Sequence, residues 1–531
     1  MGIQIKRNET SNGRSGQNLS QNTGGMFYGT APSGWASYSH PLYPSVIIKA
    51  QQILSAPAAL TAGILPNTDN TAATFTAVMS TKGNTGDTTV PVVTIIGLGG
   101  VASTVNLCTY TVGSADTTIL LQGTALAAAI NANTYLNGWS ATFATATLTL
   151  IAPTSQGIYP NTSAVPTFTI TGAFVWATAT LGVSGTASVY ADAYYQISEY
   201  YRINSTGNLW IGFISSSSSF QEILALQLAS SNSLRNMWIA DTSTGRGAVG
   251  SLLATTQSIQ AIVNNISSLH PVEILYRPNI AALTSTTLST LPNGQTNTNT
   301  NNVQVIISQD GLSQGNLLFQ TSGYSISNIG AKCGTQSQLR ISGSDAQPIN
   351  QNNVSNGIEN NTAAISNGTL INAISVSLFQ QLFGTTSTNT SGYAYIGFVQ
   401  YPGNVTGTFW TGNSMFISGA NRFAYMNDNQ VWDQVTRIIL QTYIPQINAE
   451  IQYDNSGNIA SSSIGYLQNL GIAAITAGMI TGINPPYISG TPIVTISANQ
   501  NVQATNTLNI GVGTAENGII RNIVVTNGYT N

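Results

Sequence analysis

Histidine serves many nucleophilic and metal-dependent sites, and this chain contains only two histidines, His40 and His270. A histidine-based site would therefore need both of them. His270 precedes Pro271 at the entry to a predicted strand, which favours a boundary residue over a catalytic base. The sequence has no P-loop pattern for phosphates, no nucleophile elbow, no HExxH pair and no CxxC pair. We therefore predict no catalytic site, no metal site and no cofactor.

Aspartates are the remaining candidates for acid–base chemistry. Asp241 and Asp310 follow apolar runs, where a parallel-sheet enzyme keeps its catalytic groups. The residues after them, Thr-Ser and Gly-Leu, are typical of turns and helix caps, so a structural role is favoured. Asp428 and Asp433 form a further acid pair, but their place at the start of a predicted helix favours capping and dipole roles.

Two arginines are notable because the chain keeps so few charges. Arg422 and Arg437 flank or lie on an amphipathic helix predicted over residues 431–443. One interpretation is a solvated polar face, or an intramolecular i, i+4 pair between Arg437 and Asp433. The other interpretation is an ionic contact with the surface of a partner.

Charged residues make up 6% of the 531 residues, with 14 Lys and Arg against 17 Asp and Glu, which gives a net charge of −3. An ordinary soluble domain has about 25% charged residues. Hydrophobic residues nonetheless reach 42%, so the chain can fold, and Asn, Gln, Ser, Thr and Gly must supply its solubility. The basic residues are scattered and cannot neutralise a row of phosphates, which argues against direct binding of DNA or RNA.

The N-terminal residues and the apolar runs lack the features of targeting signals and membrane spans. Residues 1–20 are polar, and the most apolar stretch, 470–483, is short and broken by glycines. We expect no signal peptide and no membrane insertion. Cys108 and Cys333 lie far apart and imply no disulfide framework, which is compatible with synthesis in a reducing cytoplasm.

The elements that would position these residues fall into parts of different composition. Residues 1–25 begin with the alternating Ile3 and Ile5 and continue as a polar stretch with glycines, which predicts an extended N-terminal arm. Residues 26–60 are rich in aromatic residues and proline and contain the apolar run 46–48, typical of a buried strand. The arm therefore enters a folded core.

Residues 61–185 are dominated by Thr, Ala and Val and contain one basic residue, Lys82. An Ala- and Leu-rich helix is predicted over 118–132, with Asp116 as its N-cap. This part is predicted to be a β-rich domain that is inserted in the core. Its β-branched and aromatic runs, bounded by turn residues, predict strands at 90–96, 105–112, 139–151 and 168–174.

After residue 186, helical and strand patterns alternate. Residues 26–60 and 186–531 are therefore predicted to form an α/β (α+β) core with a mixed, largely parallel sheet. The helix over 431–443 would be capped by Asn429 or Asp428. Strand patterns then continue almost to the C-terminus, at 493–496, 507–512 and 519–525.

Several segments resemble parts of contractile phage tail sheath proteins, or of the sheaths of related contractile injection systems. Residues 110–118, 127–133 and 144–153 follow the order strand, helix, strand and resemble the small domain that is inserted in many sheaths. Residues 194–204, YYQISEYYRIN, followed by LWIG, resemble the start of a sheath core. Residues 421–447, which include NRFAY, VWDQVTR and YIPQI, resemble the helix near the sheath C-terminal domain.

This resemblance implies a core built from both chain ends, outward domains, and terminal arms that add strands to the sheets of neighbouring subunits. The helix over 431–443 and its flanks would face an inner tube, with Arg422 and Arg437 in contact with it. The residues implied in the strand exchange are Ile3, Ile5, Ile519, Ile520, Ile523 and Val525.

The function implied is that of a structural, non-enzymatic subunit. Copies would form rings, conventionally hexameric, stacked helically around an inner tail tube, with baseplate and tail terminator proteins as further partners. Contraction would be a rearrangement between two packings that drives the tube through the host envelope for genome ejection, without nucleotide. The protein would be made in the host cytoplasm and reside in the virion tail of a bacteriophage.

Two other classes remain open. A passive virion or surface protein, such as a tail fibre, a capsid decoration or an S-layer component, would share the low charge and the abundance of Thr, Asn and Gly. The alternation of helices and strands counts against that class. A particle-borne polysaccharide-degrading enzyme would need two acids that converge in one cleft.

Overall fold

The protein is described here from a computed structural model. The described residues are 22–55, 70–97, 100–215, 218–241, 243–266, 270–279, 287–307, 309–310, 314–323, 328–339, 341–342, 363–366, 369–370, 376–384, 392–399, 409–419, 423–447 and 449–516.

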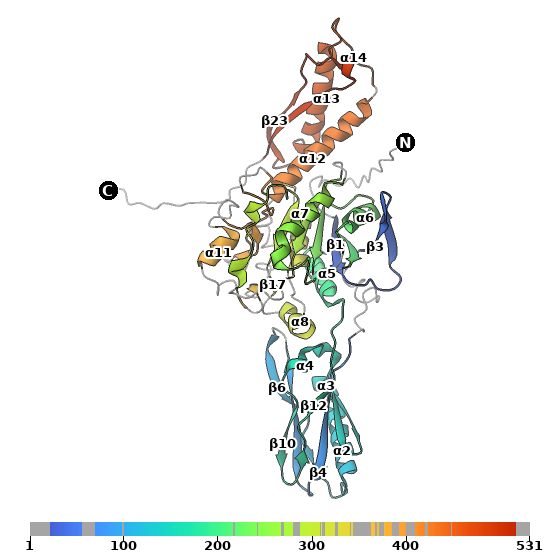
Figure 1. Ribbon diagram of the computed structural model, residues 1–531, viewed down its shortest axis with the longest axis vertical. Helices are drawn as coiled ribbons and strands as arrows, with labels where there is room; N and C mark the ends of the chain where they lie inside the picture. Colours follow the sequence, from blue (N-terminus) through green and yellow to red (C-terminus); the bar gives the residue numbers. More distant parts are fainter. Residues whose placement is uncertain are drawn as a thin grey trace, which may run out of the picture.

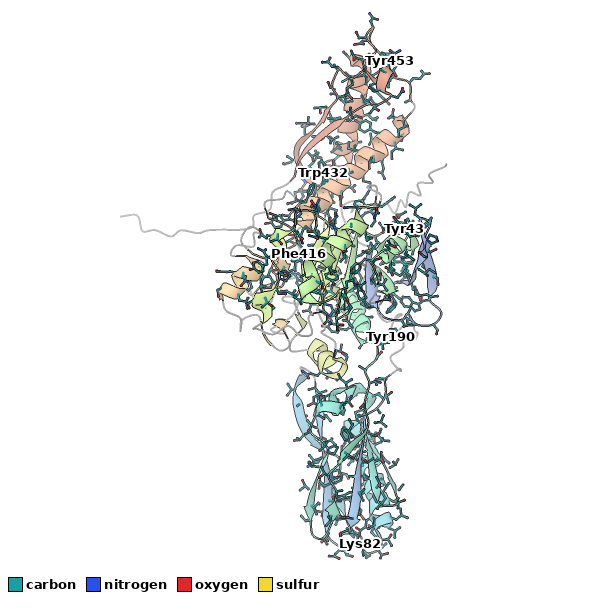
Figure 2. All side chains as sticks on the ribbon, viewed as in Figure 1. Tyr43, Lys82, Tyr190, Phe416, Trp432 and Tyr453 are labelled. Atoms are coloured by element: carbon teal, nitrogen blue, oxygen red, sulfur yellow. The ribbon has the colours of Figure 1, made fainter. Side chains whose placement is uncertain are left out.

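Three parts follow one another along the long axis of the molecule (Figure 1). The sheet body, described within residues 22–55 and 187–425, lies in the middle. The insert, residues 70–186, forms one end, and the C-terminal region, residues 426–516, forms the other. Lys82 lies at the far tip of the insert and Tyr453 at the opposite tip of the molecule (Figure 2).

Eight strands of the described residues build the main sheet of the sheet body. Their bounds are β1 Asn22–Tyr28, β2 Ala36–His40, β3 Tyr43–Ile53, β13 Asn208–Ile214, β14 Asn236–Ala240, β15 Glu273–Arg277, β16 Val303–Ile306 and β20 Tyr395–Ile396. The strand order is β2-β3-β13-β1-β14-β15-β16-β20, and the six strands from β13 to β20 run parallel. β3 and β2 extend the sheet antiparallel at one edge. The predicted α/β fold with a mixed, largely parallel sheet is therefore confirmed.

Helices and short strands of the sheet body surround this sheet. The helices are α5 Ala191–Ile203, α6 Glu222–Ala229, α7 Leu252–Val263, α8 Gln314–Ser322, α9 Ile329–Gln338 and α11 Val376–Phe383, with the short 3₁₀ helices η3 Val249–Ser251, η4 Thr287–Thr290 and η5 Gly294–Thr296. The short strands are β17 Gln309–Asp310, β18 Ala363–Ser366, β19 Thr369–Leu370, β21 Phe398–Val399 and β22 Phe409–Trp410. α5 packs against α9, and α6 packs against β2 and β3.

The strand β1 lies in the centre of the sheet, between β13 and β14. It begins at Asn22, so the last residues of the predicted arm, 1–25, belong to the sheet body, and residues 1–21 lie outside the described residues. Gly24 and Gly25 are needed here because a Cβ on Gly25 would lie 2.5 Å from the ring of Trp238. The glycines that made this stretch look like a polar arm therefore make room for the core.

The insert contains two antiparallel sheets and helices that pack around an apolar core of their own. The elements are β4 Thr74–Thr81, β5 Thr88–Ile96, β6 Ala102–Asn106, β7 Tyr110–Thr111, α2 Ile119–Ala132, α3 Thr134–Asn137, β8 Ser140–Ala144, β9 Thr147–Ile151, η2 Thr154–Gln156, α4 Tyr159–Thr162, β10 Thr167–Thr171, β11 Val175–Trp176 and β12 Thr180–Val183. The core includes Phe75, Met79, Trp139 and Leu150. This arrangement agrees with the β-rich composition of the segment.

The N-cap of α2 differs from the prediction. Thr118, and not Asp116, caps the helix, since its side chain accepts a hydrogen bond from the Leu121 N–H at 3.2 Å. The Asp116 carboxylate instead accepts hydrogen bonds from the Tyr110 hydroxyl at 2.7 Å and from the Gly113 N–H at 3.0 Å. These bonds, that of Tyr110 above all, lower the pKa of Asp116.

The C-terminal region consists of two long helices and a two-stranded ribbon. Its elements are α12 Met426–Tyr443, η7 Ile444–Gln446, α13 Ser461–Met479, β23 Ile488–Thr495, α14 Val502–Thr505 and β24 Gly511–Glu516. The helix α12 begins at Met426, after Tyr425, which makes no side-chain cap bond, so the predicted caps Asn429 and Asp428 lie inside the helix. The helix α13, which includes most of the apolar stretch 470–483, was not predicted from the sequence. Among the helices of the described part of the chain, none is long and apolar enough to span a membrane.

Glycines in α13 allow α12 and α13 to approach closely. A Cβ on Gly471 would lie 2.3 Å from the Tyr443 hydroxyl oxygen and 3.2 Å from Val494. That hydroxyl donates a hydrogen bond to the Leu467 carbonyl at 2.7 Å, so Tyr443 is held in place. Gly465 in the same helix has no such neighbour within 4 Å.

We predict that Gly471→Ala lowers the free energy of unfolding of the C-terminal region by about 1–3 kcal/mol, the usual cost of overpacking. The matched variant Gly465→Ala should instead raise it by about 0.5–1 kcal/mol, because alanine favours the helix where space is open. Urea unfolding of both variants measures the difference. Equal effects of the two substitutions would contradict the close packing of the helices.

Candidate functional site

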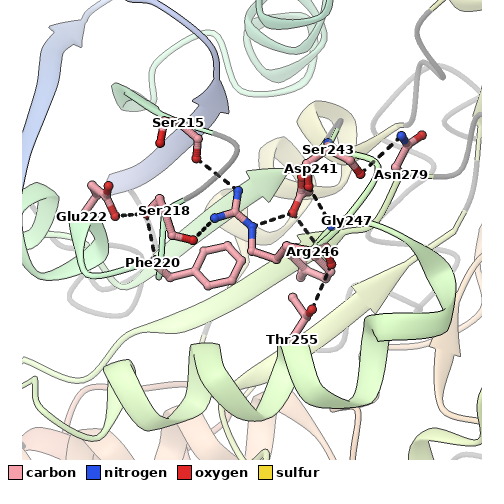
Figure 3. A network of polar contacts seen from close by, with 11 residues as sticks. Ser215, Ser218, Phe220, Glu222, Asp241, Ser243, Arg246, Gly247, Thr255 and Asn279 are labelled. Carbon is pink, nitrogen blue, oxygen red and sulfur yellow. Dashed lines mark hydrogen bonds and ion pairs between the residues drawn. The ribbon is translucent and has the colours of Figure 1, made fainter.

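The carboxyl ends of the parallel strands hold a network of buried charges (Figure 3). Asp241 follows β14, is fully buried, and accepts hydrogen bonds from three donors. These are the Arg246 Nε at 3.1 Å, the Tyr276 hydroxyl at 3.0 Å and the Ser243 N–H at 2.8 Å. The bond from Ser243 closes the turn that the sequence predicts at this place.

Arg246 is the centre of this network. Its guanidinium carbon lies 4.3 Å from the ring centroids of both Tyr28 and Phe220, so the cation is enclosed by two aromatic faces. The guanidinium also donates to the Ser215 carbonyl at 3.3 Å and to the Ser218 carbonyl. Burial, with the nearby Asp241 carboxylate, raises the pKa of Tyr28 and the pKa of Tyr276. The carboxylate and the guanidinium are thus engaged with each other and with the surrounding chain.

A second ion pair lies at the same edge of the sheet. The fully buried Arg277, at the end of β15, donates to Asp192 in the first turn of α5. The Gln196 side chain donates to the other Asp192 oxygen at 3.0 Å. A cavity of about 450 Å³ opens here between the ends of β1, β13 and β14, and Asp192 is the one ionisable acid among its lining residues. Since Asp192 is already paired with Arg277, we interpret the charged groups at this edge as structural contacts and not as an acid–base pair.

The other candidate residues are dispersed. His40 lies at the end of β2, where its Nδ1 accepts a hydrogen bond from the Leu42 N–H at 3.2 Å, while His270 precedes β15. Cys108 and Cys333 are buried, and burial raises the pKa of the Cys108 thiol to about 11. Asp310 lies in β17, and its side chain is outside the described residues. Within the described ranges, no group of three or more His, Cys, Asp or Glu side chains could hold a metal ion.

Arg437 lies on the polar side of α12, which faces the amino-terminal edge of the main sheet. It is only 7% exposed and donates to the Gln434 side chain at 3.0 Å. Asp433, one turn earlier, lies close enough to raise the pKa of Arg437, although burial lowers this pKa overall, to about 10. This geometry favours the intramolecular interpretation of Arg437 over a contact with a partner. It also places Asp433 in a partly buried charge cluster and not in the predicted cap.

We define the joint as Arg235, His270, Glu273, Asp433 and Arg437, which act on one another electrostatically across the boundary between sheet body and C-terminal region. Burial raises the pKa of Asp433 to about 7, although Arg437 and Arg235 oppose this shift. Burial, and then the Asp433 charge, raises the pKa of Glu273. The sequence indicated only the pair of Asp433 with Arg437, because the other members of the joint lie up to 202 positions away (235 to 437).

The other predicted site residues lie outside the part of the chain that the structure describes. They are Arg422, Ile3, Ile5, Ile519, Ile520, Ile523 and Val525. The described chain ends at Glu516 in β24, shortly before the C-terminal members of this set.

We predict that Asp241→Asn lowers the free energy of unfolding by about 3–5 kcal/mol, because it leaves the enclosed Arg246 cation without its counter-charge. The matched variant Glu199→Gln removes an acid that pairs with Arg202, whose side chain is 36% exposed. That change should cost less than about 1 kcal/mol. Urea unfolding measures both, and a loss for Asp241→Asn no larger than that of Glu199→Gln would contradict the role given to the network.

Comparisons with known proteins find two kinds of similarity. A family model described as "DUF2586, C-terminal domain" matches residues 423–531. No curated protein matches the chain. Among solved structures, a chain of the PVC sheath complex of an extracellular contractile injection system, in the contracted state, is similar at 11% identity and a TM-score of 0.40. A chain of the anti-feeding prophage (AFP) baseplate is similar at 10% identity and a TM-score of 0.39, and each similarity covers 64% of this chain and 80% of the other.

Proposed function

We propose that this chain is a structural subunit of a contractile tail sheath, or of the sheath of a related contractile injection system. The observation that carries the proposal is the order of the parts in the fold. One sheet body takes its central strand from the N-terminal end of the chain, holds the insert at one end and the C-terminal region at the other (Figure 1). The resemblance implies such a core with an inserted outward domain, although the sequence assigned the C-terminal region to the core, whereas its apolar residues form a cluster of their own.

The distribution of charge supports a structural role. The insert, residues 70–186, contains only Lys82, Asp87 and Asp116 as charged residues. Asp87 accepts hydrogen bonds from the N–H groups of Asn84 at 2.7 Å and Ala173 at 2.8 Å, which lower its pKa. A surface of this kind suits an outward domain that must not repel the identical domains of neighbouring copies.

The assembly belongs to the same proposal. Subunits would form stacked rings, hexameric by the resemblance, around an inner tube, with baseplate and tail terminator proteins at the ends. Contraction by rearrangement of subunits would drive the tube through the host envelope, with the sheath located in the virion tail. The tube contact would involve Arg422 and the flanks of α12, since Arg437 faces the interior of its own chain.

We expect the purified protein to form hollow cylinders of stacked rings in negative-stain electron microscopy, because strand exchange between identical copies propagates without a template. Isolated monomers at all concentrations would contradict the proposal and favour the passive surface protein. Conversion of a polysaccharide by the pure protein would favour the enzyme alternative.

The ribbon β23–β24 supports the strand-exchange part of the proposal. Among the described residues, β23 and β24 pair only with each other, and Ile493 on β23 is 62% exposed. A two-stranded ribbon is marginal by itself and gains hydrogen bonds when further strands are added. The alternating apolar residues at the two chain ends are the proposed additions: Ile3, Ile5, Ile519, Ile520, Ile523 and Val525.

We predict that removal of residues 1–15, or of residues 520–531, abolishes cylinders while it leaves a folded monomer. The sheet body should remain intact because its central strand begins only at Asn22. Sedimentation and microscopy detect the loss of polymers, and far-UV circular dichroism confirms folding. Ordered cylinders from either truncated chain would contradict the exchange of arms.

A matched deletion serves as the control for these truncations. Removal of the insert, residues 70–186, takes away far more of the chain but leaves both ends, and the insert has its own core. This variant should still form cylinders. A soluble, folded chain without the insert that fails to polymerise would mean that the insert is part of the subunit lattice.

A further inference from the structure

The helix α12 has two sides that belong to different parts of the molecule. Val431 and Val435 on its apolar side pack with α13 and β23 in the core of the C-terminal region. The core cluster of the sheet body contains no residue of α12 among the described residues. The C-terminal region therefore completes its apolar core without the sheet body, apart from Ile341, which joins that cluster from the sheet body.

The polar side of α12 makes the contact with the sheet body. The Gln430 side chain donates to Asn236 at the start of β14 at 3.2 Å, and the Asn429 side chain donates to the Asn301 carbonyl at 2.5 Å. Asp433 and Arg437 follow along the helix and interact with Arg235 across the boundary. Polar interfaces between domains of one chain usually permit relative motion.

Hydrogen bonding across the joint is incomplete. Glu273 accepts one bond from the Asn302 side chain at 3.1 Å, while its second oxygen has no partner among the described residues. Within the described residues, the Arg235 Nε and the His270 Nδ1 are also buried without a hydrogen-bond partner. Unpartnered buried polar groups cost free energy that they regain when water reaches them, which lowers the cost of opening.

We propose that the contact between the polar side of α12 and the sheet body is a releasable joint, which opens while the sheet body and the C-terminal region each stay folded. The pivot is the first turn of α12, where Met426 packs with Met415 and Ile417 of the preceding segment. Trp432 lies at this boundary in Figure 2. The inference follows from the fold of the single chain and does not depend on the proposed assembly.

The charges of the joint make its opening dependent on pH. The pKa values of Asp433 and Glu273 are raised in the closed joint, that of Asp433 to about 7, and they return to about 4 when water reaches the carboxyls. The closed joint therefore holds protons, and the stability that they contribute is complete below about pH 4 and lost as the pH rises through about 7. Each proton shifts the opening equilibrium by up to about tenfold per pH unit between the pKa of the open joint and that of the closed joint, and no further at higher pH.

The other groups of the joint act outside this window. The pKa of His270 is lowered by burial and by Arg235 and Arg437, so its contribution is lost only as the pH falls below about 6.5, and its partial exposure weakens it. The pKa values of Arg235 and Arg437 are lowered by burial to about 9 and about 10, so both stay mostly charged below about pH 8.5. Between about pH 6.5 and 8.5, the two carboxyls decide the change.

Opening can be measured by fluorescence transfer between labels on the two parts. Ala261 on α7 and Asn455 at the tip of the C-terminal region are exposed, and both native cysteines are buried, so Ala261→Cys and Asn455→Cys can be labelled specifically. The labelled full chain is mixed with excess unlabelled chain, so that transfer reports one molecule. Urea is then added at pH 6.5 and at pH 8.5, with circular dichroism as the measure of unfolding.

We expect transfer to be lost before the circular dichroism changes, and at a lower urea concentration at pH 8.5 than at pH 6.5. Coincident loss of both signals at the two pH values would overturn the releasable joint. The variant Glu273→Gln with Asp433→Asn keeps the shapes but not the titration, so its opening should be the same at both pH values. Glu450→Gln, an exposed acid of the same region, is the control and should keep the wild-type shift.

A retained pH shift in the double variant, or its loss in Glu450→Gln, would show that the joint carboxyls do not control opening. Where the double variant does not fold, the single variant Glu273→Gln must reduce the shift. The wild-type chain alone decides whether the C-terminal region opens as a unit.

Discussion

The sheet body depends on the pairing of β1 with β13 on one side and β14 on the other. Those two neighbours do not pair with each other, so without β1 the sheet would divide between its antiparallel edge and its remaining parallel strands. The chain achieves this insertion with Gly24 and Gly25, whose missing side chains leave space for Leu234 and for the Trp238 ring. A strand that begins at residue 22 therefore joins elements drawn from positions up to 396.

Charges are few, and two of the described ion pairs lie at the carboxyl ends of the parallel strands. Arg277 and Asp192 connect the end of β15 to α5, while Arg246 and Asp241 hold a loop over the end of β14. Enclosed ion pairs add little net stability, because desolvation offsets most of the attraction, but the loss of one partner is costly. Such pairs favour one arrangement of the chain over others. The polar surface consists mainly of Thr, Asn, Ser and Gln, because charged residues are only 6% of the chain.

The alternation of helical and strand patterns after residue 186 predicted the largely parallel sheet and the helices α5, α6 and α7, but not α8, α9 and α11. The strand β1 could not be predicted, because Gly25 is required by its contact with Trp238, which lies 213 positions away (25 to 238). The helix α13 was not predicted for a related reason. Gly471 suggests a turn in the sequence, but in the structure it leaves space for the side chain of Tyr443. Of the joint, only the local pair of Asp433 with Arg437 could be predicted, because a single charged residue carries no sign of a distant partner. Asp241 could be assigned to a turn because its hydrogen bond to Ser243 is local.

The kind of contact, apolar or polar, differs between the interiors of the three parts and the boundary of the releasable joint proposed above. Apolar contacts fill the interior of the sheet body, the insert and the C-terminal region, each as a cluster of its own. Between sheet body and C-terminal region, apart from the apolar contacts of Ile341 and Met426, the contacts are amides, carboxyls and guanidinium groups, which water can replace at little cost. The apolar side of α12 faces away from the sheet and contributes to the core that keeps the C-terminal region folded. The polar side of α12 attaches this region to the sheet body through interactions that depend on the protonation of Asp433 and Glu273.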